Sequence, residues 1–191
     1  DYYEAAYHSN YVIGQGHVAS YGFNYSYTGL ESKELAGSSH SDKAYAGYLS
    51  YECAPIKPLS SVWGVRYEKH TSWGGRFNPS FNLMYKASDG FKLRGMVAYG
   101  FRAPSIKEQY FTFDHTAAGY VVYGGEITPP ADLNIPESVQ FNPLVEENAI
   151  NSSISAEFSY GSIGMHRLTY FYNHIEDMID FILLGFTPTY W

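Results

Sequence analysis

Apolar and polar residues alternate with a period of two along most of this chain. In residues 17–28 the odd positions from Ala19 to Tyr27 are apolar or aromatic, and the even positions from Ser20 to Thr28 are small or polar. Successive side chains of a β-strand point to opposite faces, so this period is typical of strands. The alternation recurs in residues 43–53, 59–69, 77–86, 91–101, 150–160 and 168–173, with a weaker segment near 2–8. The sequence therefore predicts an all-β chain of about eight strands, each roughly ten residues long.

The apolar face of these expected strands is mostly aromatic. Trp63, Val65 and Tyr67 fall on one face of their segment, while Arg66 and Glu68 fall on the other. The whole chain contains 20 Tyr and 12 Phe, whereas a soluble sandwich builds its core mainly from aliphatic residues. Aromatic side chains suit contact with lipid and its interfaces, and a polar face suits a wet lumen. This pattern favours an antiparallel transmembrane β-barrel over a soluble β-sandwich.

Composition excludes several other classes. The longest uninterrupted apolar stretch is Phe181 to Leu184, so the chain has no segment approaching the ~20 apolar residues of a membrane helix. A net charge of −7 argues against a nucleic-acid partner, and a single cysteine excludes a disulfide framework. The sequence contains no Ser-His-Asp arrangement, phosphate loop or zinc motif. We therefore expect neither an enzyme nor an intrinsic cofactor.

The connections between the expected strands differ in length. Short turns are expected at residues 54–58, 87–90 and 161–163, and longer loops at 29–42, 71–76 and 103–148. Short turns at one end and long loops at the other are typical of outer-membrane barrels. Eight strands can close into a small barrel, so a complete structural or adhesion barrel is one alternative. A soluble all-β carbohydrate-binding module is another.

The end of the chain favours an internal fragment of a larger barrel. Residues 165–184 are too many for one crossing of the membrane, and we expect a bend near residues 174–176. After them the chain reaches Trp191 without an obvious return strand.

Three stretches carry a resemblance to a known family. They are residues 78–86 (Asn-Pro-Ser-Phe-Asn-Leu-Met-Tyr-Lys), residues 93–108 with Gly-Phe-Arg-Ala-Pro at their centre, and residues 171–179. In order and spacing they resemble the barrel of TonB-dependent outer-membrane receptors. The resemblance implies that residues 1–191 are an internal piece of the C-terminal half of a barrel of about 22 strands. It also implies that residues 103–148 form a long extracellular loop, and that the plug domain and the terminal strands lie outside the chain.

The resemblance further implies a function. Receptors of this family lie in the outer membrane, surrounded by its lipid, and take up scarce nutrients such as haem, cobalamin or ferric siderophores. The TonB complex, acting through the plug, powers uptake without chemistry on the ligand. We therefore expect a small-molecule nutrient as ligand and TonB as the protein partner.

The choice of nutrient depends on residues in the long loop. Haem receptors of the family carry a Phe/Tyr-Arg-Ala-Pro box and an Asn-Pro-Asp/Asn-Leu box, with a haem-ligating histidine between them. Residues 101–104 match the first box, whereas in residues 142–145 the leucine comes one position early. The resemblance thus implies His115 as a candidate ligand of haem iron. The candidate ligand-binding residues are Phe101, Arg102, Tyr110, His115, Tyr120, Tyr123, Asn142, Pro143 and Leu144.

Two of these candidates also have structural interpretations. Neutral imidazole suits iron and neighbouring aromatic rings suit a porphyrin; the alternative is that His115 is a solvated loop residue and that the aromatics pack the loop base. Arg102 either pairs with an acidic group of the ligand or forms a salt bridge inside the barrel. Charged residues on the polar face are expected to pair in the lumen or against the plug; they are Glu52, Arg66, Glu68, Lys86, Arg94 and Glu157.

Overall fold

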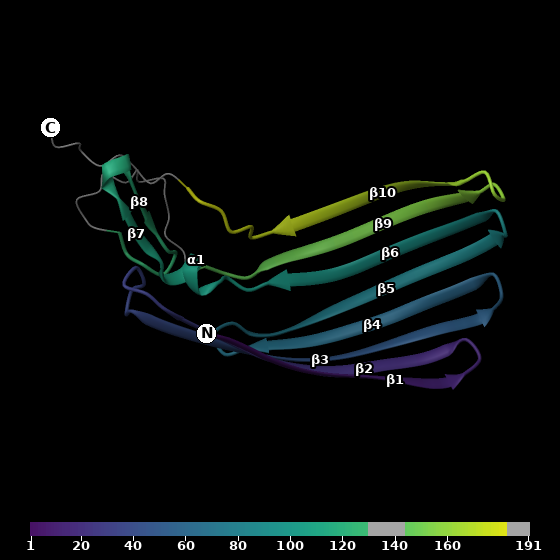
Figure 1. Ribbon diagram of the computed structural model, residues 1–191, viewed down its shortest axis with the longest axis horizontal. Coiled ribbons are helices and arrows are strands. Elements are labelled where there is room, and N and C mark those ends of the chain that lie inside the picture. The colour runs from purple at the N-terminus through teal and green to yellow at the C-terminus, as the bar shows by residue number, and fades with distance from the viewer. Residues whose placement is uncertain (130–143, 183–191) are drawn as a thin grey trace.

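A computed structural model describes residues 1–129 and 144–182 (Figure 1). Eight long strands form one antiparallel sheet in the order β1-β2-β3-β4-β5-β6-β9-β10. They are β1 (Tyr2–Gly14), β2 (His17–Glu31), β3 (Ser39–Ile56), β4 (Leu59–His70), β5 (Gly74–Ser88), β6 (Phe91–Arg102), β9 (Glu147–Ser159) and β10 (Met165–Glu176). The predicted all-β fold of about eight antiparallel strands is confirmed.

A separate small unit lies between β6 and β9. Residues 103–146 contain the helix α1 (Ile106–Tyr110), the hairpin of β7 (Thr112–His115) and β8 (Tyr120–Tyr123), and the 3-10 turn η1 (Thr116–Ala118). We call these residues the excursion. Figure 1 shows α1, β7 and β8 together at one end of the sheet. Every other pair of neighbouring strands is consecutive in the chain, so only the excursion interrupts the up-and-down order.

The sheet is open. Its edges are β1 and β10, and within the described residues no pairing joins these two strands. The alternative of a small closed barrel is therefore wrong for the strands that the structure describes. Such edges expose backbone hydrogen-bonding groups, which a membrane protein satisfies by pairing them with further strands.

The pairing register separates two faces of different chemistry. Directly opposite residues of antiparallel strands share a face, and Trp63 pairs with Phe81 while Tyr67 pairs with Phe77. Their ring centroids are 4.3 Å and 4.7 Å apart, and Trp63 remains 56% exposed. Among the described residues, buried apolar side chains are limited to Leu35, Ala44, Ala46 and Ile106. A soluble domain of this size buries a far larger core, so the aromatic face requires an apolar surrounding.

The two ends of the sheet carry connections of different length. At one end the strands are joined across residues 15–16, 57–58, 89–90 and 160–164, and at the other across 32–38, 71–73 and 103–146. The first two connections of the second end are shorter than the predicted loops at 29–42 and 71–76, because the strands continue through part of those segments.

The strands are longer than a bilayer requires. They contain 12 to 18 residues, more than the ~9–11 that cross a bilayer, so they extend beyond it. In the described residues no helix is long and apolar enough to span a membrane. The expected bend at the end of the chain is present, since β10 ends at Glu176 and Asp177 has a left-handed φ of 55°.

Candidate functional site

Arg102 lies at the end of β6 where the excursion leaves the sheet. Its register partner is Glu147, the first residue of β9, so the two side chains share the inner, polar face. Arg102 Nε donates to Glu147 Oε2 at 2.7 Å, and Nη2 donates to Oε1 at 2.8 Å. This is the two-pronged pairing of a guanidinium with a carboxylate, which gives both strength and a defined geometry.

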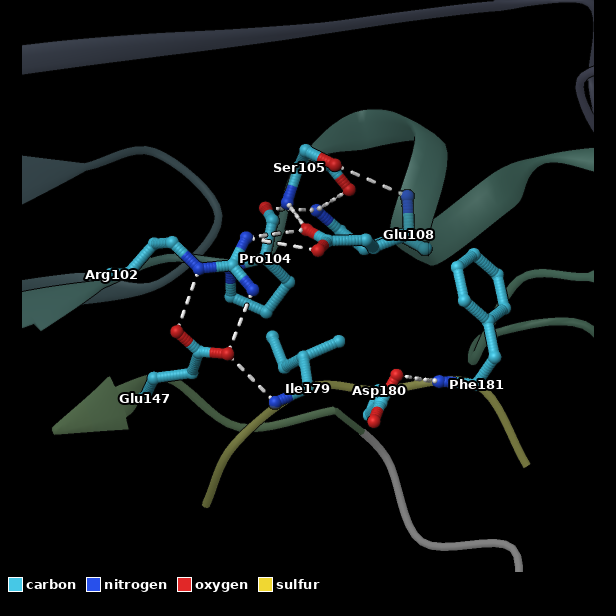
Figure 2. Close-up of polar contacts among 9 residues, drawn as sticks. Arg102, Pro104, Ser105, Glu108, Glu147, Ile179, Asp180 and Phe181 are labelled. Carbon is cyan, nitrogen blue, oxygen red and sulfur yellow. Dashed lines mark hydrogen bonds and ion pairs between the residues drawn. The ribbon is translucent and has the colours of Figure 1, made fainter. Parts of the chain in front are cut away.

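A second carboxylate occupies the remaining side of the guanidinium. Arg102 Nη1 donates to both oxygens of Glu108, at 2.9 Å and 3.0 Å, and Glu108 belongs to α1 (Figure 2). Four donor contacts therefore hold one arginine between the helix and β9. We call Arg102, Glu108 and Glu147 the rim clasp.

Local sequence explains why α1 starts beside the clasp. Ser105 is the N-cap, and its Oγ accepts a hydrogen bond from the Glu108 backbone N–H at 3.2 Å. Glu108 Oε2 accepts in return from the Ser105 backbone N–H at 2.7 Å. This reciprocal arrangement is a capping box. Pro104 comes directly before it, where the strand must end. The Phe-Arg-Ala-Pro-Ser-Ile-Lys-Glu run thus specifies a strand end, an ion pair and a helix start.

The pKa of Glu108 reflects these contacts. Burial alone would raise the pKa of this carboxyl, but hydrogen bonds from the Ser105 backbone and the Arg102 guanidinium outweigh burial and lower it. Glu108 therefore stays ionised to lower pH than an ordinary glutamate.

Glu147 also reaches the segment that follows β10. Its Oε1 accepts a hydrogen bond from the backbone N–H of Ile179 at 2.7 Å, as Figure 2 shows. The clasp consequently connects β6, α1, β9 and the chain beyond β10. No backbone ladder joins α1 to β6 or Ile179 to β9 in the described structure, so side chains carry these connections.

The excursion is also attached to the connection between β2 and β3. Leu35 and Phe111 form an isolated antiparallel bridge, the backbone N–H of Ala36 donates to the Tyr110 carbonyl at 2.9 Å, and Leu35 is only 4% exposed. The Tyr110 ring stacks on His40 with centroids 3.7 Å apart. Tyr110 therefore anchors the excursion to the sheet.

Aromatic rings line one face of the hairpin. Phe111, Phe113 and His115 occupy alternate positions, and Tyr120 lies opposite His115 in the register. Ring centroids are 5.9 Å apart for Phe111 and Phe113, 5.3 Å for Phe113 and His115, and 5.2 Å for His115 and Tyr120. His115 and Tyr120 are exposed. We call these four residues the aromatic row; such a row can stack on a planar ligand.

The other predicted site residues are dispersed. Phe101 packs edge-on against His70, with centroids 6.0 Å apart. Tyr123 is half-buried opposite Thr112, and Leu144 is half-buried over Gly125. Asn142 and Pro143 lie outside the described residues. The structure thus brings His115 and Tyr120 together and places Arg102 in ion pairs, one of its two expected roles.

Sequence reasoning missed the partners of Arg102. Glu108 was detectable, because Ser105 and Glu108 have the spacing of a capping box. Glu147 gave no local signal, since it lies 45 positions from Arg102. Within residues 1–129 and 144–182, no group of three or more His, Cys, Asp or Glu side chains is placed to hold a metal ion.

Charges on the inner face are paired elsewhere too. Glu157, 4% exposed, lies 3.1 Å from Lys92, 2.7 Å from Arg167 and 3.8 Å from Arg94. Arg66 lies 2.7 Å from Glu68. Pairing within the lumen, as predicted, accounts for these charges.

Comparison with known proteins identifies this architecture. A family model described as "TonB dependent receptor-like, beta-barrel" matches residues 1–190. The chain belongs to the TonB-dependent receptor family. Its members are outer-membrane receptors and not enzymes, so the strands of this chain lie in the bacterial outer membrane.

Two curated relatives are about one quarter identical to this chain over the stretches that align. One is an iron-regulated outer membrane virulence protein of Vibrio cholerae serotype O1, 26% identical over 93% of the chain. The other is a probable TonB-dependent siderophore receptor, PirA, of Acinetobacter baumannii, 25% identical over 78% of the chain. The chain spans 27% and 20% of their respective lengths.

Solved structures share the fold of the segment. The siderophore receptor PirA of Pseudomonas aeruginosa superposes with a TM-score of 0.73 at 19% identity, covering 90% of this chain and 30% of that one. PirA of Acinetobacter baumannii superposes with a TM-score of 0.67 at 18% identity, covering 93% and 27%. At this identity the likeness establishes the barrel fold alone.

Proposed function

We propose that this chain is part of a receptor that imports a ferric siderophore across the outer membrane, powered by TonB through a plug domain outside the chain. The observation that carries the proposal is the aromatic row at the loop end of a barrel segment, in which His115 and Tyr120 are exposed. Two relatives of that segment are named as siderophore receptors.

The contacts of the site support different roles for the aromatic row and for Arg102. The rings of Phe113, His115 and Tyr120 are the aromatic surface that we assign to contact with the ligand. Arg102 already makes four donor contacts to Glu108 and Glu147, so we assign it the role of holding the excursion in place rather than of binding the ligand. A siderophore carries its iron already chelated, so a receptor for it recognises the chelate's surface and supplies no iron ligand itself.

Haem is a second candidate because His115 is exposed and flanked by Phe113 and Tyr120. A neutral imidazole in that setting suits an axial bond to haem iron while the rings contact the porphyrin. The siderophore proposal is preferred on the names of the relatives, none of which mentions haem.

The test uses the full-length receptor containing this segment. Binding of a panel of ferric siderophores, and of haemin, is measured by quenching of intrinsic fluorescence. We expect one siderophore class to bind and the double substitution Phe113→Ala with Tyr120→Ala to weaken it about tenfold, because two stacking surfaces are lost. Tyr170→Ala on the outer face of β10 is the matched control and should leave affinity unchanged.

Haemin distinguishes the two candidates. Binding of haemin with a Soret shift that His115→Ala abolishes, together with no binding of any siderophore in the panel, would replace the siderophore proposal with haem. Equal affinities for the aromatic-row variant and Tyr170→Ala would remove the aromatic row from the ligand site.

A further inference from the structure

The sheet divides between β5 and β6 toward its loop end. These strands pair from Ser88 and Phe91 up to Ser80 and Ala98, and there the pairing stops. The next residue of β5 is Pro79, which has no backbone N–H to donate to the ladder. Beyond it β5 pairs only with β4, and β6 only with β9. The divergence of the two strands can be followed in Figure 1.

Side chains bridge this division near the inner face. Arg76 Nη2 of β5 lies 2.9 Å from Oε1 of Glu146, which is 8% exposed and directly precedes β9. The His70 ring meets Phe101 edge-on. Both contacts connect the two sides of the division. Side chains therefore hold these two sides together where the ladder has stopped.

On the outer face the division forms an apolar notch of about 520 Å³. Its walls include Trp63, Val65, Pro79, Phe81, Val97 and Ile150. All six are apolar, and Trp63, Val65, Val97 and Ile150 are more than 40% exposed. Family membership places this face against lipid, so the medium that contacts the notch consists of acyl chains.

Two lysines lie on the same outer face, closer to the loop end. Lys69 follows Val65 by four positions and lies opposite Tyr45, and Lys43 lies opposite Tyr27. Both are exposed, and no ion pair of either is formed within the described residues. Four residues of strand span about 13 Å, so Lys69 lies about 13 Å from Val65 toward the loop end. This places it near the level of the lipid headgroups. Cations at this level attract anionic lipid headgroups.

We propose that the notch holds one acyl chain of a phosphorylated lipid of the outer leaflet, whose phosphate lies against Lys69 and Lys43. The apolar walls match the chain, and the lysines match the phosphate. This site rests on membership of the family and is independent of which nutrient the receptor imports. Its consequence is a lipid seated where the ladder between β5 and β6 stops.

The experiment titrates the full-length receptor in detergent with bisphosphorylated hexa-acyl lipid A and counts bound lipid by native mass spectrometry. Val97→Phe fills the notch while keeping the surface apolar, and we expect lipid A affinity to fall at least about fivefold. Ile154→Phe places the same ring on the same face of β9 outside the notch and should leave affinity unchanged. Equal affinities for these two variants would overturn the notch as the site.

Two lysine substitutions test the contact with the headgroup phosphate. Lys69→Gln should weaken lipid A about fivefold, whereas Lys57→Gln, at the opposite end of the sheet, should not. Dephosphorylated lipid A should bind the native receptor at least as weakly as lipid A binds Lys69→Gln, because it loses the contacts with both lysines. If Lys69→Gln matches Lys57→Gln, the phosphate contact is wrong. Siderophore affinity of each variant verifies folding and separates failure of this site from failure of the proposed function.

Discussion

Two ion clusters on the inner face of the sheet have opposite compositions. At the loop end, the cation Arg102 is shared by the carboxylates Glu108 and Glu147. At the short-turn end, the carboxylate Glu157 is shared by Lys92, Arg94 and Arg167. Both clusters lie on β6 and β9, so they differ in position along the strands and in what they connect.

The importance of each ion cluster depends on whether backbone ladders also join the segments that the cluster connects. Glu157 is the register partner of both Lys92 and Arg167, so this cluster joins three strands that backbone ladders already join. The rim clasp reaches α1 and the backbone of Ile179, which have no ladder to β6 or β9 in the described structure. The difference indicates that an ion pair matters most where no backbone ladder joins the segments that it connects.

The largest expected effect is that of Arg102→Ala. Losing the guanidinium leaves two carboxylates facing each other and removes the link between α1 and β9, so ligand affinity should fall about tenfold, in line with the loss of charge-assisted hydrogen bonds. Amides of residues 106–125 should also exchange hydrogen faster. The matched control is Arg94→Ala: Arg94 lies on the same strand with the same 46% exposure, but its ion-pair distance is 3.8 Å. Similar exchange in both variants would remove the distinction between the clusters.

A smaller effect is expected from pH. The pKa of Glu108 is lowered in the folded protein, so its contribution is complete above the ordinary glutamate pKa of about 4.3. The contribution is lost as pH falls through the lowered pKa. Protection of the α1 amides, measured by pulsed hydrogen exchange, should therefore decrease below about pH 4.

Glu108→Gln supplies the control for this titration. It should reduce protection of α1 already at pH 6 and weaken the dependence on pH below 4. A native receptor whose α1 protection is constant from pH 6 to 3 would show that Glu108 does not hold the excursion.

The smallest effect is expected from Glu157→Gln. The three cations are 29% to 50% exposed and can be hydrated once the carboxylate is gone, while the ladders remain. The urea midpoint of unfolding should therefore fall only slightly. Exchange in residues 106–125 should not change. A loss of protection there would mean that the two clusters are coupled through β6 and β9.

Much of the sheet was predictable because its signal is local. The alternation around Trp63 and Arg66 assigned the two residues to opposite faces of the sheet, and the register confirms this separation. The predicted loops at 29–42 and 71–76 were too long, because Gly29, Gly74 and Gly75 interrupt the alternation but still pair with neighbouring strands. Pairing with a neighbour extends a strand beyond what its own sequence indicates.

The sequence by itself determined the strands, their two faces and the capping box at Ser105, since each depends on residues a few positions apart. Only the tertiary structure decided that Arg102 is held by Glu108 and Glu147 and that the sheet divides above Pro79. Both depend on the chain returning after the excursion, so that β9 pairs with β6 and places Phe158 opposite Phe91. No short-range pattern specifies such a contact, because its partners meet only when a long loop closes.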